Sequence, residues 1–289
     1  MEYQPIIIIG AARSGTKLVR DLIASHPEVE KIPFDINYVW RIGNESLSHD
    51  EISPEGITPE IKTKIRKYFK SCQHGKPFLV EKTVSNCLRV AAVHKVFPEA
   101  KFIHLYRDGW DVIESAYRQW IAPPDWRYIL SKTRKYPLFM AFGYASGYAV
   151  KTIRQLFGRN RASISPWGPC YQGIYEDIHS KPVLEVCAIQ WTRCVNYAVR
   201  DLSVIPSAQV YHLNYEDFIH DPQGRLVEIA GYLGYDPKPY LNHLEQRVSS
   251  ANIGKGRRAL SDEQIKLIES YVRDTALLLE TMHPAEASN

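Results

Sequence analysis

The sequence of 289 residues contains few cysteines and no long hydrophobic run. Its five cysteines are an odd number, and none of them form a C-x-x-C pair. Neither a disulfide framework nor a zinc knuckle is therefore expected, and reduced thiols are favoured. The aliphatic run Ile6–Ile9 is too short for a signal-peptide core or a membrane span. We expect a soluble chain with no membrane span and a cytoplasmic location.

The sequence also lacks a strong excess of charge of one sign. It has 36 Lys and Arg against 32 Asp and Glu, which gives a net charge of +4. A dedicated nucleic-acid-binding protein usually carries a clustered basic face, so no nucleic-acid partner is expected. Hydrophobic residues make up 45% and charged residues 24%, which is typical of a globular protein. The length allows a single domain over 1–289 and leaves the oligomeric state open.

Short apolar strands alternate with amphipathic helices along most of the chain. The predicted strands are Pro5–Gly10, Pro77–Glu81, Lys101–Tyr106 and Gln209–Leu213. The predicted helices are Gly15–Ser25, Pro59–Cys72, Ser85–Phe97, Trp110–Trp120, Leu184–Asp201, Gly224–Leu233, Pro239–Arg247 and a last helix that begins at the capping box Ser261–Gln264 and runs to about Met282. Residues 31–58 are predicted to be irregular. This alternation predicts an α/β fold with a P-loop-like, mainly parallel sheet flanked by helices.

Residues 121–182 interrupt this alternation. The segment is rich in aromatic residues and contains Arg154, Arg159 and Arg161. A loop-rich, aromatic insertion in an α/β chain is where a substrate pocket or lid is expected, although for much of 139–157 a helical subdomain with an ordinary core is favoured. We predict a helical, aromatic-rich insertion that forms a substrate pocket or lid.

The first strand, a glycine-containing turn and the first helix together predict an anion site. This geometry directs backbone N–H groups and the positive end of the helix toward an anion, and Arg13, Ser14 and Thr16 add donors and charge. Gly10 and Gly15 have the spacing of the Walker A pattern, G-x-x-x-x-G-K-[ST]. However, Thr16 stands where the lysine of that pattern should be, so the Lys-Ser/Thr order that serves a γ-phosphate and Mg²⁺ is missing.

A second anion site is indicated by Arg107-Asp-Gly-Trp-Asp111-Val-Ile-Glu-Ser115. Arg107 ends a predicted strand, and Ser115 lies on the helix that follows. An arginine fork and a serine hydroxyl can converge on one phosphate. Taken alone, Arg107 could instead pair with Asp108 or Asp111, and Ser115 could be a surface serine.

Together, these two segments resemble the sulfotransferases that use 3′-phosphoadenosine 5′-phosphosulfate (PAPS). In that family, [KR]-S-G-T holds the 5′-phosphosulfate, and Arg13–Thr16 matches it. A segment of the form R-[DN]-x-x-D-x-x-x-S holds the 3′-phosphate, and Arg107–Ser115 matches it. The resemblance extends to Glu81–Thr83 and Tyr215–Asp217. It also includes the late Gly- and Lys/Arg-containing loop 252–258.

The resemblance implies a set of donor-binding residues and no metal ion. The expected residues are Arg13, Ser14, Gly15, Thr16, Lys17, Arg107, Ser115, Tyr215, Gly254, Lys255, Gly256 and Arg257. Sulfuryl transfer is an in-line displacement at sulfur, and the transferred group carries less negative charge than a phosphoryl group. Fixed cations can therefore serve where a kinase needs Mg²⁺.

The catalytic candidates are Arg13 and Lys82 for charge stabilisation and a carboxylate as general base. In some family members a histidine lies two residues after the lysine of the Lys-Thr segment, but Val84 occupies that position here. Carbohydrate-type members use an acidic residue soon after the first helix, which makes Asp35 the first choice of base. Glu81 is the second choice and His104 the third.

The sequence favours a glycan or a hydroxylated small metabolite as the acceptor, sulfated at a hydroxyl or an amine. The pattern of the two motifs is closer to the bacterial and carbohydrate-type branches of the family than to the aryl sulfotransferases. Two other hypotheses remain open at this point. One is a P-loop kinase-like phosphotransferase, and the other is a non-catalytic nucleotide-binding protein that keeps the fold.

Overall fold

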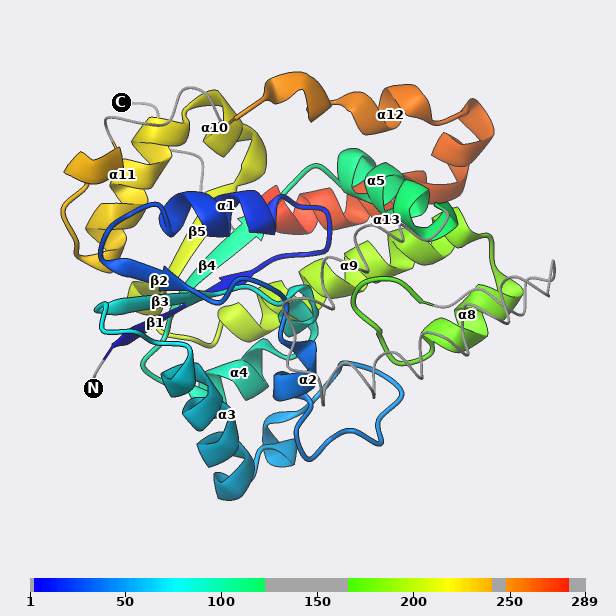
Figure 1. The fold of residues 1–289 in the computed structure, drawn as a ribbon. Coiled ribbons are helices and arrows are strands. Elements are labelled where there is room, and N and C mark those ends of the chain that lie inside the picture. The colour runs from blue at the N-terminus through cyan, green and yellow to red at the C-terminus, as the bar shows by residue number, and fades with distance from the viewer. Residues whose placement is uncertain (1–2, 123–165, 241–247, 281–289) are drawn as a thin grey trace.

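The computed structural model describes residues 3–122, 166–240 and 248–280 (Figure 1). Five strands form one sheet in the order β2-β3-β1-β4-β5. They are β1 (Gln4–Ile9), β2 (Val29–Lys31), β3 (Phe78–Glu81), β4 (Lys101–Tyr106) and β5 (Val210–Asn214). All four strand pairs are parallel. The predicted α/β class with a parallel sheet flanked by helices is confirmed.

Strand β1 lies at the centre of the sheet because it is apolar on both faces. Ile6 and Ile8 belong to one hydrophobic cluster, and Ile7 and Ile9 belong to the other. Successive side chains of a strand point to opposite faces, so an unbroken isoleucine run can serve both layers. A strand of this kind is stable only when helices cover both sides of the sheet.

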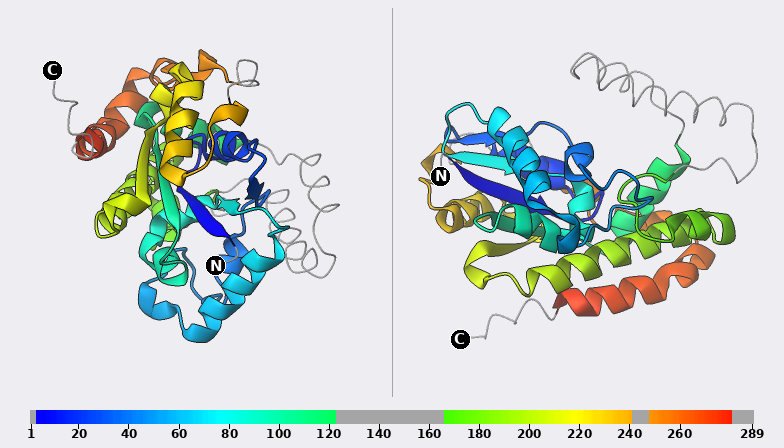
Figure 2. Two further views of the ribbon diagram at one scale, coloured as in Figure 1. Left: turned by 90° about the vertical axis from the view of Figure 1, so that its left-hand side faces the viewer. Right: turned by 90° about the horizontal axis from the view of Figure 1, so that it is seen from below.

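Helices pack on both faces of the sheet (Figures 1 and 2). One face is covered by α1 (Thr16–Ile23), α10 (Tyr215–His220) and α11 (Pro222–Leu233). The other face is covered by α3 (Pro59–Ser71), α4 (Val90–Val96), α5 (Gly109–Ile121), α9 (Val183–Leu202) and α13 (Asp262–Glu280). The shorter helices are α2 (Asn37–Trp40), α8 (Ile174–Ser180) and α12 (Lys255–Ala259). No helix in the described ranges is long and apolar enough to cross a membrane.

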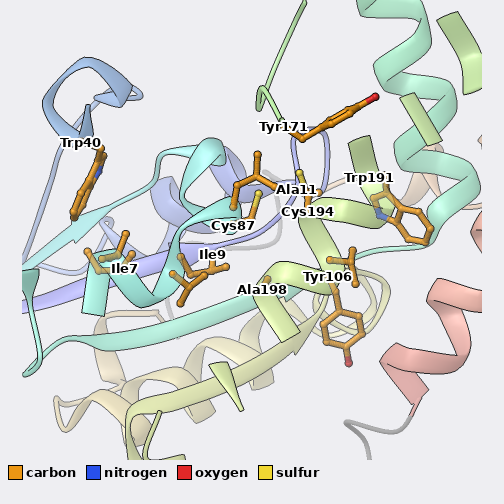
Figure 3. Close-up of a cluster of buried hydrophobic side chains, with 14 of the residues drawn as sticks. Ile7, Ile9, Ala11, Trp40, Cys87, Tyr106, Tyr171, Trp191, Cys194 and Ala198 are labelled. Carbon is orange, nitrogen blue, oxygen red and sulfur yellow. The ribbon is translucent and has the colours of Figure 1, made fainter. Parts of the chain in front are cut away.

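The core on the α9 face contains both aromatic and small side chains. Figure 3 shows Ile7 and Ile9 of β1 in the same cluster as Cys87, Cys194 and Trp191. Each of these five residues is at most 3% exposed. All five cysteines of the chain carry free thiols, in agreement with the reduced state expected from their number and spacing.

Three local predictions need correction. The sheet has a fifth strand, β2, which the sequence did not reveal because its three residues include a single buried side chain. The region 31–58, predicted to be irregular, contains α2. The single helix predicted over 85–97 is divided into a 3₁₀ helix, η2 (Val84–Leu88), and α4.

The division between η2 and α4 lies at Arg89. Its backbone leaves the helical region, with φ −152° and ψ 33°. Its buried guanidinium donates to the side chains of Asn86 and Asn37. Tertiary hydrogen bonds to a buried charge thus override a helical pattern that local sequence favours.

The capping box at the start of α13 is present as predicted. The backbone N–H of Gln264 donates to Ser261 Oγ at 3.3 Å, and the N–H of Ser261 donates to Gln264 Oε1 at 2.9 Å. The described part of the helix runs to Glu280. Most of the predicted insertion at 121–182 and most of the helix predicted over 239–247 fall outside the described residues.

A glycine-to-alanine pair tests how closely α5 packs on α9. A Cβ atom at Gly109 would lie 2.5–2.9 Å from three ring atoms of the buried Trp191. Gly109→Ala should therefore lower the free energy of unfolding by about 1–3 kcal/mol through overpacking. Gly231→Ala is the matched control, because this exposed position in α11 has open space around it and should gain roughly 0.5–1 kcal/mol. Urea denaturation measures both, and equal stability of the two variants would contradict the packing.

Candidate functional site

Each strand of the sheet is followed, at or after its carboxyl end, by a residue that the sequence analysis selected. These residues are Arg13 after β1, Asp35 after β2, Lys82 after β3, Arg107 after β4 and Tyr215 after β5. The carboxyl ends of parallel strands share one edge of the sheet, which is where open α/β sheets bind their ligands. The fold thus brings residues from five separate stretches of sequence to the same edge.

The turn after β1 has a backbone suited to anion binding. Gly15 precedes α1 with φ 91°, and Arg13 has φ 75°. Arg13 is the one non-glycine residue with positive φ in the described ranges, a strained conformation that is most often found at functional sites. Ser14 and Thr16 are buried within the turn, and Lys17 is exposed on the first turn of α1. The first N–H groups of α1 are free to face an anion.

Arg13 connects the two predicted anion motifs. Its Nε donates to Ser115 Oγ on α5 at 2.9 Å. Solvent still reaches the Arg13 side chain, yet partial desolvation lowers the pKa of its guanidinium, and the like charges of Arg118 and Arg107 lower it further. Three guanidinium groups that act on one another in this way favour the binding of an anion between them.

Arg107 is a buried cation of the site, with 8% of the residue exposed. Its guanidinium donates to the backbone oxygens of Arg13 at 3.3 Å and Asn252 at 2.8 Å. It also donates to Asp111 Oδ2 at 3.1 Å. The Nε–H group is buried and has no hydrogen-bond acceptor among the described residues, while the Glu216 carboxylate lies 3.9 Å away. An anion that accepts this N–H would fit the site.

Asp111 holds the late loop against α5. Its Oδ1 accepts from the N–H of Gly256 at 2.7 Å, and its Oδ2 accepts from the N–H of Gly254 at 2.9 Å. The approach is so close that a Cβ atom at Gly256 would lie 2.2 Å from the carbonyl oxygen of Trp110. In the sequence, Asp111 stands only as a motif position and an ion-pair candidate for Arg107. Its role as the acceptor for Gly254 and Gly256 depends on the tertiary structure.

Tyr215 lies over the turn after β1. A Cβ atom at Gly15 would meet the Tyr215 ring at 2.3 Å, so the ring packs directly on the glycine. The Arg107 guanidinium carbon lies 4.4 Å from the centre of the same ring. Tyr215 thus fixes the turn relative to Arg107. Its neighbour Glu216 accepts a hydrogen bond from the N–H of Asp108 at 3.2 Å.

The cations of the segment 252–258 lie at the rim of the site, and Lys255 and Arg257 belong to α12, so the loop predicted here is partly helical. Lys255 and Arg257 are exposed. The Arg257 guanidinium lies 5.3 Å from the ring centre of Trp110 on α5. The backbone of this segment contacts Arg107 through the carbonyl oxygen of Asn252, whereas its charged side chains extend toward solvent.

Lys82 and Asp35 form an ion pair at the same sheet edge. Lys82 Nζ donates to Asp35 Oδ1 at 2.6 Å. The Lys82 side chain is 10% exposed and that of Asp35 is 37% exposed, so the carboxylate is the more accessible partner. A half-exposed carboxylate paired with an enclosed ammonium combines a proton acceptor with a fixed positive charge.

Glu81, the second candidate base, is completely buried. One carboxylate oxygen accepts from the hydroxyl of Thr83, and the other accepts from Asn86 Nδ2 at 3.1 Å. Desolvation raises the pKa of this carboxyl group to about 7. His104, the third candidate, is buried within β4, and its Nδ1 lies 3.2 Å from Nδ1 of His212.

A cavity of about 490 Å³ lies between the Arg107 turn and residues of α9 and α13. Its lining includes Tyr106, Arg107 and Trp191. It includes neither Lys82 nor Asp35, so this cavity is separate from the ion pair. In the ranges 3–122, 166–240 and 248–280, no three His, Cys, Asp or Glu side chains are placed to share a metal ion.

A family model described as "Sulfotransferase family" matches residues 5–186. The chain belongs to the sulfotransferase family. The match includes the turn after β1, the Lys82 segment and the Arg107–Ser115 segment, which are the parts of the site described above. Family membership therefore agrees with the resemblance that the two motifs indicated.

Solved sulfotransferases share this fold at low sequence identity. The sulfotransferase domain from the curacin biosynthetic pathway superposes with a TM-score of 0.54 at 15% identity, covering 96% of this chain and 98% of that one. A sulfotransferase from Alicyclobacillus acidocaldarius gives a TM-score of 0.52 at 16% identity, covering 98% of this chain and 96% of that one. These similarities establish the fold.

Curated relatives match over part of their length. Protein-tyrosine sulfotransferase 1 of Danio rerio is 33% identical over 120 residues, which are 36% of this chain and 33% of that protein. An uncharacterized protein of Aquifex aeolicus is 24% identical over 212 residues, which are 65% of this chain and 26% of that protein. The chain thus matches about a third or less of the length of these two relatives.

Glu81 gives a prediction for the pH dependence of stability. Because its pKa rises from 4.5 to about 7 on folding, the folded state holds a proton that the unfolded state releases in this window. The free energy of unfolding should therefore fall as the pH rises from about 4.5 to about 7. Over this range the Glu81→Gln variant should lose roughly 1–3 kcal/mol less of that free energy than wild type does. Urea denaturation at several pH values measures it.

The control for that experiment is Glu263→Gln, which changes an exposed carboxyl group on α13. Its stability curve should keep the wild-type slope. Parallel curves for wild type and Glu81→Gln would contradict the assignment.

Proposed function

We propose that this chain transfers a sulfuryl group from PAPS to a hydroxyl, or an amine, of a glycan or small-metabolite acceptor, without a metal ion. The observation that carries the proposal is the connection of the two anion motifs through Arg13. Its Nε donates to Ser115, and its carbonyl oxygen accepts from Arg107. Two anion sites joined in this way suit a nucleotide with phosphate groups at both ends of its ribose.

The residues around Arg107 suit the 3′-phosphate of the donor. The buried Nε–H of Arg107, which has no acceptor among the described residues, offers a charge-assisted hydrogen bond, and Ser115 adds a hydroxyl donor. Helix α12, which follows Gly254, supplies Lys255 and Arg257 nearby. Tyr215, which packs on Gly15, offers an aromatic surface for the adenine.

The residues around the β1 turn suit the 5′-phosphosulfate. Backbone N–H groups at the start of α1 and the hydroxyls of Ser14 and Thr16 supply hydrogen bonds. Arg13 and Lys82 supply positive charge that stabilises the transferring and leaving oxygens. Lys17, at the exposed end of the turn, adds charge at the entrance. PAPS itself supplies the sulfuryl group.

Asp35 is the proposed general base. Its carboxylate is accessible, whereas that of Glu81 is buried and already accepts two hydrogen bonds. Asp35 takes the proton of the acceptor hydroxyl as the acceptor oxygen attacks sulfur, and Lys82 moves its hydrogen bond from Asp35 toward the departing oxygen. The pair therefore acts on both the attacking oxygen and the leaving oxygen of an in-line displacement.

Thermal stabilisation by nucleotides tests the donor. At a concentration of about 100 times Kd, adenosine 3′,5′-bisphosphate should stabilise the fold by about 2.7 kcal/mol, or roughly 5–10 °C in Tm. ATP and adenosine 5′-monophosphate should give smaller shifts because neither carries a 3′-phosphate. A larger shift with ATP would reject the PAPS assignment.

Arg107→Ala should reduce the shift for adenosine 3′,5′-bisphosphate to that of adenosine 5′-monophosphate. Ser115→Ala should do so in part, and it removes no charge from the interior. Arg273→Ala, at an exposed position on α13, is the control and should bind as wild type does. An equal loss for both nucleotides would show that Arg107 does not recognise the 3′-phosphate.

Substitution of Asp35 tests the base. Asp35→Asn should lower kcat by about 10²–10⁴-fold while leaving the thermal shift with adenosine 3′,5′-bisphosphate close to that of wild type. The assay follows the conversion of PAPS in the presence of three acceptors: N-acetylglucosamine, p-nitrophenol and an acidic peptide that contains tyrosine. The peptide is included because protein-tyrosine sulfotransferases are among the relatives. A wild-type kcat in Asp35→Asn would reject this base.

A further inference from the structure

The backbone that carries Asp35 is held by the residue next to Lys82. The hydroxyl of Thr83 accepts a hydrogen bond from the N–H of Ile36 at 2.9 Å. The same hydroxyl donates to Glu81, whose carboxylate lies beneath it in the core. Thr83 is 1% exposed and Glu81 is 0% exposed, so these hydrogen bonds are shielded from water.

A second arm of the same network holds Asn37, the next residue along. Asn86 Nδ2 donates to the other oxygen of Glu81, and Arg89 Nε donates to Asn86 Oδ1 at 3.0 Å. The guanidinium of Arg89 also donates to Asn37 Oδ1. Buried side chains that begin at Glu81 thus reach both residues that follow Asp35.

The far end of the network is anchored at Asp50. Its Oδ1 accepts from Asn37 Nδ2 at 3.0 Å, and its Oδ2 accepts from Ser85 Oγ at 2.8 Å and from the N–H of Cys170 at 2.9 Å. Asp50 is 2% exposed, and the charge of Arg89 contributes to lowering the pKa of its carboxyl group. The anchor is therefore an ionised group that accepts three hydrogen bonds from these donors, with Arg89 Nη1 3.9 Å from its Oδ1.

Unlike the apolar contacts of an ordinary core, the hydrogen bonds of this network restrain the position of one short backbone segment. Apolar packing would cover the same volume without the desolvation of several charged groups, so stability alone is a weak reason for its presence. Its hydrogen bonds are directional, and they converge on a segment at the start of α2 where Ile36 has no side-chain cap of its own. A directional restraint on a short segment fixes the position of the side chain that the segment carries.

We propose that Thr83, anchored by Glu81, is a positioning residue for Asp35. The dipeptide Lys82-Thr83 holds Asp35 at two points: Lys82 binds the carboxylate, and Thr83 binds the backbone one residue later. This inference rests on the proposed function, because it takes Asp35 as the base. It assigns Glu81, which the sequence offered as a second base, to the support of Thr83.

The test compares Thr83→Val with Thr83→Ser. Valine has nearly the shape of threonine but can neither accept from Ile36 nor donate to Glu81, whereas serine can do both. With PAPS and the most active acceptor of the three named above, Thr83→Val should lower kcat roughly 10–100-fold, because small displacements of a catalytic group have effects of this size. Thr83→Ser should stay within about threefold of wild type. Binding of adenosine 3′,5′-bisphosphate should change by less than about twofold in both.

The matched control is Thr192→Val. This substitution also removes a side-chain hydrogen bond, the 3.0 Å contact between Thr192 on α9 and Thr275 on α13. That bond is remote from the Lys82–Asp35 ion pair. The kcat of Thr192→Val should remain that of wild type. If Thr192→Val and Thr83→Val lose activity equally, the effect of Thr83 is one of general stability and the inference is wrong.

A double variant separates positioning from other effects. If Thr83 acts through Asp35, adding Thr83→Val to Asp35→Asn should cause no further loss of kcat, whereas independent effects would multiply. Loss of activity in Asp35→Asn with none in Thr83→Val would overturn this inference and leave the base intact. A wild-type kcat in Asp35→Asn would overturn the base itself.

A crystal structure of Thr83→Val gives a measurement that does not depend on turnover. The separation of Lys82 Nζ and Asp35 Oδ1, now 2.6 Å, should increase beyond hydrogen-bond distance. A contact that stays at this length in Thr83→Val would contradict the positioning role.

Discussion

The ion pair of Arg107 and Asp111 is the interaction on which the rest of the site depends. Arg107 reaches back to the carbonyl oxygen of Arg13, and Asp111 accepts the N–H groups of Gly254 and Gly256. One pair thus joins the turn after β1, the start of α5 and the late loop. Both side chains are buried, so loss of either partner would leave an uncompensated charge in the interior.

A second constraint acts on the other side of β1. The loop after β3 carries Lys82 and Thr83, which contact the segment after β2 through a side chain and through the backbone. The two halves of the site are therefore built differently. The Arg107 half is a cluster of cations that suits an anion, and the Lys82 half is an ion pair over a buried polar network. Parallel strands bring the halves together because their carboxyl ends share one edge.

The placement of both motifs between a strand and a helix was predictable because it depends on residue type and spacing. The order Arg-Ser-Gly-Thr lacks the lysine of a nucleoside triphosphate site. The i, i+4 spacing of Arg107 and Asp111 allows the ion pair that these two residues form at the start of α5. The role of Glu81 was not predictable. Thr83 was noted only as part of the Lys-Thr segment and Asn86 only as part of a predicted helix, whereas the fold buries both of them with Glu81.

The sequence by itself determined the parallel α/β sheet and the place of both motifs between a strand and a helix, since hydrophobic period and local motifs act over a few residues. Tertiary structure decided what depends on distant contacts. It added β2, which is too short to leave a periodic signal, divided the helix at Arg89, and placed Asp35 against Lys82, 47 positions away. Only the packing of strands in a common sheet brings such distant residues within hydrogen-bond distance.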